Sequence, residues 1–165
     1  MALRHTTAPL IPKTFARKLR FGIVSSTYHP EYTGAMVRSA EAELKGHAVE
    51  TVWVPGSFEV PIAVQRLARS GRLDAVLAFG VLWEGKTRHA GEIVRACTDS
   101  LMRIALENDV PVLHEILTVH TVAEVRVRTS GKLNRGVEAA RAALAIVAAL
   151  DKISVSRVPK PGRKP

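Results

Sequence analysis

Residues 75–82 read Ala-Val-Leu-Ala-Phe-Gly-Val-Leu, a run of apolar side chains with the length of a buried β-strand. Similar apolar or β-branched runs occur at residues 21–26, 48–54 and 110–117. Segments with helical periodicity occur at about residues 32–45, 59–70, 89–108 and 135–150. Because strands and helices alternate, the sequence predicts an α/β fold in which helices cover both faces of a four-stranded parallel sheet.

The basic residues of the chain are concentrated at its two ends. The 165 residues are 47% hydrophobic, which is enough for one core, and the formal net charge is +9. Residues 1–20 and 152–165 contain lysines and arginines but no acidic residue, whereas the stretch between them has 14 basic and 15 acidic residues. This distribution argues against a domain that binds nucleic acid, because the folded part carries almost no net charge.

The two basic ends are expected to extend from one domain. We interpret residues 1–19 as a flexible N-terminal extension, residues 20–151 as the folded domain and residues 152–165 as a proline-rich disordered tail. Contact of the tails with an acidic partner or a polyanion, or a targeting role, is the alternative interpretation.

Cys97 is the only cysteine of the chain, and it lies among apolar helix positions. A lone cysteine excludes an intrachain disulfide and is typical of a reducing compartment, so we expect a buried Cys97 and a cytoplasmic location. The sequence has no run of about 18 apolar residues, and no membrane-spanning helix is expected.

Polar and aromatic residues follow three of the predicted strands. They lie at residues 25–29, 56–59 and 83–89. The carboxyl ends of parallel strands meet at one edge of the sheet, where ligands bind in this class of fold. The sequence therefore predicts a small-molecule site at that edge, and the types of residue suggest catalysis.

The loop at residues 85–89 opens a long helix, whose free amides and dipole favour an anion. Lys86 and Thr87 add a positive charge and a hydroxyl donor, which suit a phosphate group. The glycine spacing of an ATP-binding P-loop is absent, so that class of site is excluded. A solvated turn with an N-cap is the alternative.

Four further residues have two interpretations each. His89 could move protons near neutral pH or be structural, and Glu59 could cap its own helix or accept hydrogen bonds from a sugar-like ligand. Tyr28 and Phe58 could stack on a planar ring or belong to the core. No metal-ligand spacing and no Gly-x-Ser-x-Gly motif accompany them, so a metal site and serine-hydrolase chemistry have no support.

Several motifs together resemble the 6,7-dimethyl-8-ribityllumazine synthase family over about residues 20–150. The resemblance is carried, in order, by residues 55–61 (PGSFEVP), 80–89 (GVLWEGKTRH), 111–112 (PV), 117–118 (LT) and 134–140 (NRGVEAA). It implies a flavodoxin-like winding of the sheet, assembly as homopentamers and a role in the penultimate step of riboflavin biosynthesis.

The resemblance also implies a reaction. The family condenses 5-amino-6-(D-ribitylamino)uracil with 3,4-dihydroxy-2-butanone 4-phosphate and releases phosphate and water, without a metal or an organic cofactor. Riboflavin synthase is a further expected partner, whereas a membrane or a specific nucleic acid is not. Single pentamers, paired pentamers and an icosahedral capsid remain open.

The family's functional residues are carried over by position. Tyr28 matches the ring-stacking aromatic, and Val81, Leu82 and Trp83 match the strand end whose backbone contacts the pyrimidine. Ser57, Phe58 and Glu59 match the segment that holds the ribityl chain. The resemblance implies that His89 transfers protons, that Lys86, Thr87 and Arg128 hold the phosphate, and that His114 comes from a neighbouring subunit.

The chain departs from the family pattern at several positions. His29 replaces an asparagine, His114 an aromatic residue and Arg135 a lysine. Ala90 and Gly91 replace a bulky aromatic residue and an acidic residue. The segment before Asn134 is one residue shorter, which leaves Arg126 as an alternative phosphate ligand. The substitutions at His29, His114 and Ala90 motivate a second hypothesis, in which a homologue binds flavin or lumazine or forms a shell. His114 and Glu115 also interrupt an apolar strand, either at an edge that faces a partner or ligand, or as a locally paired core histidine.

Overall fold

Four parallel strands form the centre of the computed structural model, which describes residues 11, 12, 14–85 and 87–153. The strands are β1 (Arg20–Ser26), β2 (Ala48–Val54), β3 (Ala75–Trp83) and β4 (Val112–Val119). They lie in the order β2-β1-β3-β4, and each neighbouring pair is parallel. The parallel four-stranded sheet predicted from the sequence is confirmed.

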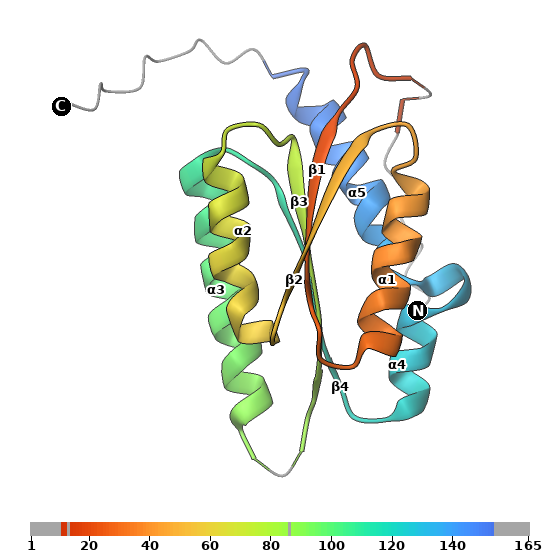
Figure 1. Cartoon of the computed structure of the whole chain (residues 1–165), viewed down its shortest axis with the longest axis vertical. Coiled ribbons are helices and arrows are strands. Elements are labelled where there is room, and N and C mark those ends of the chain that lie inside the picture. Colours follow the sequence, from red (N-terminus) through yellow and green to blue (C-terminus); the bar gives the residue numbers. More distant parts are fainter. Residues whose placement is uncertain (1–10, 13, 86, 154–165) are drawn as a thin grey trace, which may run out of the picture.

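Helices cover both faces of the sheet (Figure 1). One face carries α2 (Val60–Arg69) and α3 (His89–Asn108), and the other carries α1 (Pro30–Glu43), α4 (Val122–Thr129) and α5 (Arg135–Leu150). Short 3-10 turns, η1 (Ser57–Glu59) and η2 (Gly131–Leu133), precede α2 and α5. The three-layer α/β architecture is therefore confirmed.

The sheet separates two apolar cores. Leu77 and Phe79 of β3 belong to the core under α1, α4 and α5, whereas Val76 and Ala78 belong to the core under α2 and α3. The strand is buried without interruption from Ala75 to Val81. Burial on both faces explains why this central strand is a continuous apolar run in the sequence.

Two local features differ from the sequence prediction. Helix α4 was not predicted, because only Val125 and Thr129 of its eight residues are buried and so short an amphipathic pattern is weak. Strand β4 begins at Val112 rather than at residue 110. Asp109 ends α3 in the left-handed conformation, with φ of 53°, and Pro111 has no N–H to donate to a strand ladder.

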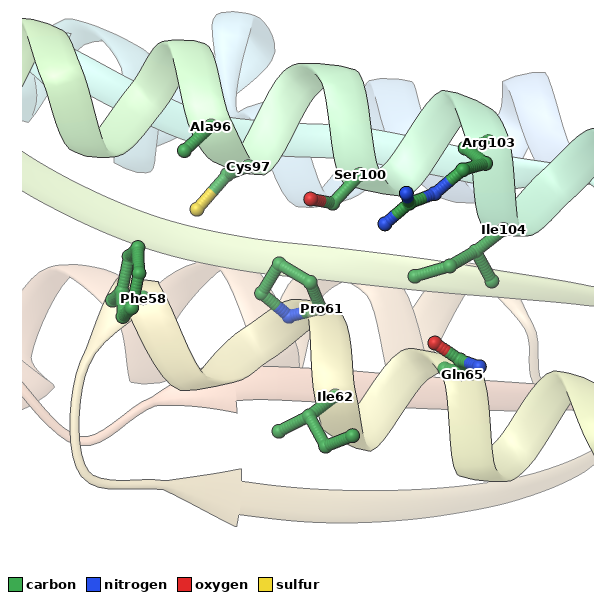
Figure 2. Close-up of a pocket in the computed structure, with 9 residues that line it drawn as sticks. All are labelled: Phe58, Pro61, Ile62, Gln65, Ala96, Cys97, Ser100, Arg103 and Ile104. Carbon is green, nitrogen blue, oxygen red and sulfur yellow. The ribbon is translucent and has the colours of Figure 1, made fainter.

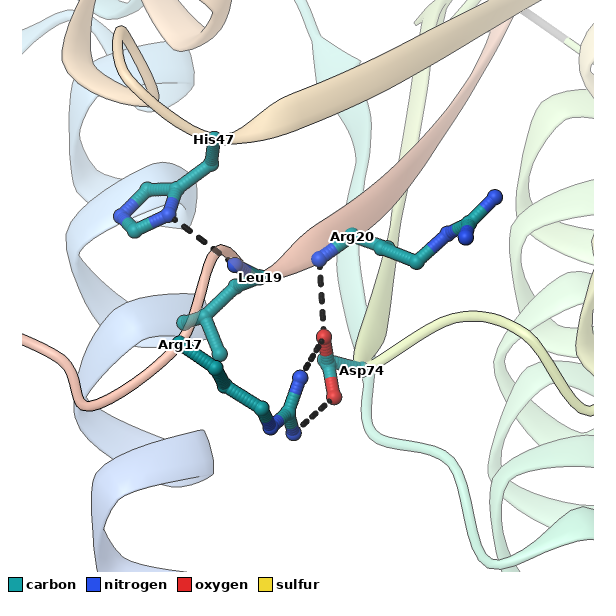
Figure 3. Close-up of polar contacts among 5 residues, drawn as sticks. All are labelled: Arg17, Leu19, Arg20, His47 and Asp74. Atoms are coloured by element: carbon teal, nitrogen blue, oxygen red, sulfur yellow. Dashed lines mark hydrogen bonds and ion pairs between the residues drawn. The ribbon is translucent and has the colours of Figure 1, made fainter.

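The chain before β1 is attached to the amino edge of the sheet (Figure 3). The carboxylate of Asp74 accepts hydrogen bonds from Arg17 Nη1 at 2.9 Å and from the backbone N–H of Arg20 at 2.8 Å. Nδ1 of His47 accepts a hydrogen bond from the backbone N–H of Leu19 at 3.3 Å. We call these contacts the amino-edge clasp. They lie at the opposite end of the strands from the predicted site.

Candidate active site

A cavity of about 390 Å³ lies at the carboxyl ends of β1, β2 and β3. Its size is within the range of small-molecule sites. The residues that line it come from the three predicted loops and from the start of α3: Tyr28, His29, Gly56, Ser57, Phe58, Glu59, Val81, Leu82, Trp83, His89 and Ile93. The structure thus brings together most of the residues selected from the sequence.

The first two loops are joined by hydrogen bonds from Thr27. Its backbone N–H donates to the Val54 carbonyl at 2.8 Å, and its hydroxyl donates to the Pro55 carbonyl at 3.1 Å. The Ser26 hydroxyl accepts from the backbone N–H of Tyr28 at 3.0 Å. These bonds fix the loop that carries Tyr28, whose side chain is 67% exposed at the cavity.

The carboxylate of Glu59 is available to a ligand. Glu59 precedes α2, and its side chain makes no capping hydrogen bond to that helix. A Cβ atom on Gly56 would lie 2.8 Å from Glu59 Oε2. Glycine at position 56 therefore leaves the space that the carboxylate occupies.

The hydroxyl of Ser57 is buried without a partner. Ser57 is 4% exposed, and its Oγ has no hydrogen-bond partner among the described residues. The Cys97 thiol donates to the Ser57 carbonyl at 3.3 Å, and burial raises the pKa of this thiol to about 11. Cys97 is fully buried as predicted, and it holds the turn that carries Ser57 against α3.

His89 is the first residue of α3, and its imidazole lines the cavity. Among the described residues no side chain caps the start of α3, which leaves its first amides available to an anion. Thr87 is exposed, is not the N-cap and does not line the cavity. Lys86 lies outside the described residues. Ile93, one turn after His89, was missed, although helical periodicity places it on the same face.

His114 lies on the edge strand β4, away from the cavity. The Thr98 hydroxyl donates to the Val94 carbonyl at 2.8 Å and accepts from His114 Nε2, also at 2.8 Å. Nδ1 of His114 accepts from the Ile116 N–H at 3.3 Å, and burial lowers the pKa of His114. Within the chain this histidine is locally paired, on a strand that is an edge of the sheet.

Arg128 lies on α4, across the sheet from α3 (Figure 1). Burial raises the pKa of Glu115 on β4 to about 7, and the positive charges of Arg135 and Arg128 act in the opposite direction. Arg135 Nε lies 3.8 Å from Glu115 Oε2. Helix α4, which carries Arg128, lies on the opposite face of the sheet from α3, whose first residue is His89.

A second hollow, of about 270 Å³, lies between α2 and α3 (Figure 2). Phe58 lines both this hollow and the cavity at the strand ends. The polar side chains that line the hollow between α2 and α3 are those of Gln65, Ser100 and Arg103, and this hollow contains neither a carboxylate nor an imidazole. It is therefore less suited to proton transfer than the cavity that contains His89 and Glu59.

Neither a metal centre nor a membrane span is found in the described part of the chain. It contains no group of three or more His, Cys, Asp or Glu side chains that could hold a metal ion. None of the helices in the same residues is both long and apolar enough to cross a membrane.

A cavity that presents an imidazole, a free carboxylate and aromatic rings at the carboxyl edge of an open parallel sheet defines a small-molecule enzyme of the α/β class. Comparison with known proteins gives the family. The model of the 6,7-dimethyl-8-ribityllumazine synthase family matches residues 18–151, and the chain belongs to this family.

Individual relatives agree with this assignment. The chain is 35% identical over 151 residues to the 6,7-dimethyl-8-ribityllumazine synthase of Xanthomonas euvesicatoria pv. vesicatoria, with 88% of this chain and 96% of the relative covered. It is also 35% identical over 140 residues to the protein of that name from Xylella fastidiosa, with 81% of this chain and 91% of the relative covered. The similarity therefore extends over the whole folded region and is not confined to the site.

Proposed function

We propose that the protein condenses 5-amino-6-(D-ribitylamino)uracil with 3,4-dihydroxy-2-butanone 4-phosphate to form 6,7-dimethyl-8-ribityllumazine, with release of phosphate and water. One observation carries the proposal: in a member of this family, a single cavity contains aromatic rings, a free carboxylate and an imidazole. These groups match a planar ring, a polyol and a reaction that needs proton transfers.

The pyrimidine ring is assigned to the wall formed by Tyr28 and the end of β3. Pairing of β3 with β1 ends at Phe79, whereas pairing with β4 continues to Trp83. Past Phe79, the β1 side of β3 therefore has no strand partner among the described residues, and its backbone groups there are available to a ligand. This geometry supports backbone contacts from Val81, Leu82 and Trp83 to the edge of the ring, with Tyr28 stacked on its face.

The ribityl chain is assigned to the turn at residues 57–59. Ser57 and Glu59 both line the cavity. The Ser57 hydroxyl has no hydrogen-bond partner among the described residues, and the Glu59 carboxylate makes no capping hydrogen bond to α2. A buried polar group without a partner costs about 1–3 kcal/mol, so a ligand hydroxyl that pairs with Ser57 would recover part of this cost. Phe58 would cover the chain.

His89 is assigned the proton transfers, and the free amides at the start of α3 are assigned the phosphate, with Lys86 and Thr87. We assign Arg128 of α4 and His114 of β4 to the site of a neighbouring subunit. The support is their position: both lie at or near the edge strand β4, and neither lines the cavity of their own chain. Arg128 is preferred to Arg126 because it is the one whose charge acts on Glu115 of that strand.

The quaternary and cellular parts of the function stay predictions. They are assembly from pentamers, closed into a capsid or not, contact with riboflavin synthase, a cytoplasmic location and flexible ends at residues 1–19 and 152–165. Of these ends, residues 1–10, 13 and 154–165 lie outside the described residues, and residues 17–19 are held by the amino-edge clasp. The described part of the chain offers β4 as an edge strand to which an assembly could add.

An activity assay tests the proposal. Purified protein is mixed with the two substrates, and the absorbance and fluorescence of lumazine are followed against the slow uncatalysed condensation. General acid–base assistance is worth roughly 10²- to 10⁴-fold, so His89→Ala is expected to lower kcat within that range. Wild-type turnover that is unchanged in His89→Ala would contradict the assignment. Tight riboflavin binding without turnover would favour the flavin-binding homologue.

A further inference from the structure

The histidines of the described residues fall into two groups. The ring nitrogens of His47, His114 and His120 are engaged by Leu19, by Thr98 and Ile116, and by Glu84. Among the described residues, no hydrogen bond or ion pair engages the rings of His29 or His89, and both residues line the cavity. His89 already has a role, whereas His29 is a half-buried imidazole with none.

The backbone of His29 is held in a fixed and unusual conformation. With φ of 55° and ψ of 58°, it is left-handed, which among residues other than glycine is tolerated best by Asn, Asp and His. Its carbonyl accepts hydrogen bonds from the backbone N–H groups of Tyr32, at 2.9 Å, and Thr33, at 3.1 Å. These bonds anchor His29 to the first turn of α1.

The imidazole ring is packed among aromatic side chains. Its centroid lies 5.9 Å from those of Tyr28 and Trp83, both edge-to-face, and 6.5 Å from that of Tyr32. The rings of Tyr32 and Trp83 are themselves 6.5 Å apart. This packing restricts the ring of His29, a residue that lines the cavity, so the ring is held in place before any ligand enters.

We propose that His29 is a specificity-determining residue, whose imidazole hydrogen-bonds to the polar edge of the heterocyclic substrate. The inference rests on the proposed function, because it needs a ring bound between Tyr28 and Trp83. A neutral imidazole offers one donor and one acceptor, and a pyrimidinedione presents both N–H and C=O groups at its edge. His29 thus adds side-chain recognition to the backbone contacts of β3.

Two variants and a control test this role. His29→Phe keeps an aromatic ring against Trp83 but has no hydrogen-bonding group, and it is expected to raise the KM for the pyrimidine about 3- to 10-fold. The kcat and the KM for the butanone phosphate should stay within about twofold, since neither depends on this bond. His29→Asn suits the left-handed backbone and should show a smaller rise. His47→Asn, at the amino-edge clasp, should leave both KM values unchanged.

The dissociation constant of the pyrimidine alone, measured by titration calorimetry, separates this inference from the proposed function. If the wild-type protein binds the pyrimidine without turnover, the proposed function fails, and weaker binding by His29→Phe still supports the role of His29. An unchanged dissociation constant and KM in both variants would overturn it. Equal rises in both KM values would also overturn it, because they would indicate a general distortion of the site. A thermal melt identifies a variant that has not folded, and the other variant then decides.

Discussion

At the scale of single residues, Glu115 shows how the surroundings of a side chain change its chemistry. The side chain is 15% exposed, and its nearest positive group is Arg135 Nε at 3.8 Å, too far for a hydrogen bond. Burial dominates and raises the pKa of Glu115 from 4.5 to about 7. The folded protein therefore binds a proton at this site more tightly than the unfolded chain does.

This difference predicts a stability that depends on pH. The stabilising contribution of protonated Glu115 is complete below pH 4.5 and is lost as the pH rises through about 7. Glu115→Gln resembles the protonated form, so its free energy of unfolding at pH 8 should exceed that of the wild type by roughly 1–3 kcal/mol. At pH 5, the free energies of unfolding of the wild type and of Glu115→Gln should be similar. Urea unfolding at both pH values measures this, and a less stable variant at pH 8 would show that the pair with Arg135 is the larger effect.

At the scale of elements, the Asn134-Arg135-Gly136 motif starts α5 and sets its distance from α1. Asn134 is 4% exposed; its Oδ1 accepts from the Gly136 N–H at 2.8 Å, and its Nδ2 donates to the Thr129 carbonyl at 2.6 Å. A Cβ atom on Gly136 would lie 1.9 Å from the Met36 carbonyl oxygen. Position 136 therefore requires glycine, because a side chain there would clash with the backbone of Met36. This backbone belongs to α1 and can move only if the whole helix moves.

Gly136→Ala is accordingly expected to lower the free energy of unfolding by more than about 3 kcal/mol, at or beyond the upper end of overpacking effects. Gly91→Ala is the matched control. Gly91 lies inside α3, and a Cβ atom there would meet nothing within 4 Å, so helix propensity should make that variant neutral or more stable by up to about 1 kcal/mol. Urea unfolding of the two variants compares them. Equal stability would show that α1 and α5 can separate without cost.

At the scale of the whole molecule, the amino-edge clasp ties the chain before β1 to the sheet. Burial lowers the pKa of His47 below its ordinary value of 6.5. Burial alone would raise the pKa of Asp74, but hydrogen bonds from Arg17 and Arg20 outweigh it and bring the pKa below 3.8. Both groups therefore contribute stability above these values, and both contributions are lost as the pH falls through the folded pKa values.

Hydrogen exchange measures this effect. After correction for intrinsic rates, the amides of Leu19 and Arg20 should lose protection as the pH is lowered from 7.5 to 5, because protonated His47 no longer accepts from Leu19. Amides in the buried centre of β3 serve as the reference and should not change. In His47→Gln, which does not titrate, the pH dependence of residues 19 and 20 should disappear. If the amides of residues 19 and 20 lose the same protection in the wild type and in His47→Gln, the pH dependence comes from a titrating group other than His47.

The proposed sharing of the site between subunits has a direct test at this scale. His89→Ala and Arg128→Ala are each expected to be nearly inactive as separate assemblies. If each site takes His89 from one subunit and Arg128 from the next, co-assembly of equal amounts should restore about a quarter of the wild-type activity. Arg126→Ala in place of Arg128→Ala is the control for position on α4. No recovery from properly mixed assemblies of two inactive variants would mean that both residues act within one chain. Full activity of Arg128→Ala by itself would mean that Arg128 has no role.

The outline of the fold could be predicted from the sequence because it depends on local patterns. Residues 75–82 are apolar without a break since β3 is buried on both faces, and helical periodicity located α1, α2, α3 and α5. The polar residues after β1, β2 and β3 could be assigned to one site because carboxyl ends of parallel strands share an edge. Helix α4 could not be found, since its pattern is too short.

Only the tertiary structure could decide the contacts between residues that are far apart in the chain. The sequence shows a glycine at position 136, but the carbonyl of Met36 that requires it belongs to another helix. It shows several histidines, but packing leaves His29 unpaired in the cavity, pairs His114 with Thr98 and places Arg128 across the sheet from His89. Periodicity reports which face of an element is buried, whereas the partner that covers this face is set by the packing of the whole chain.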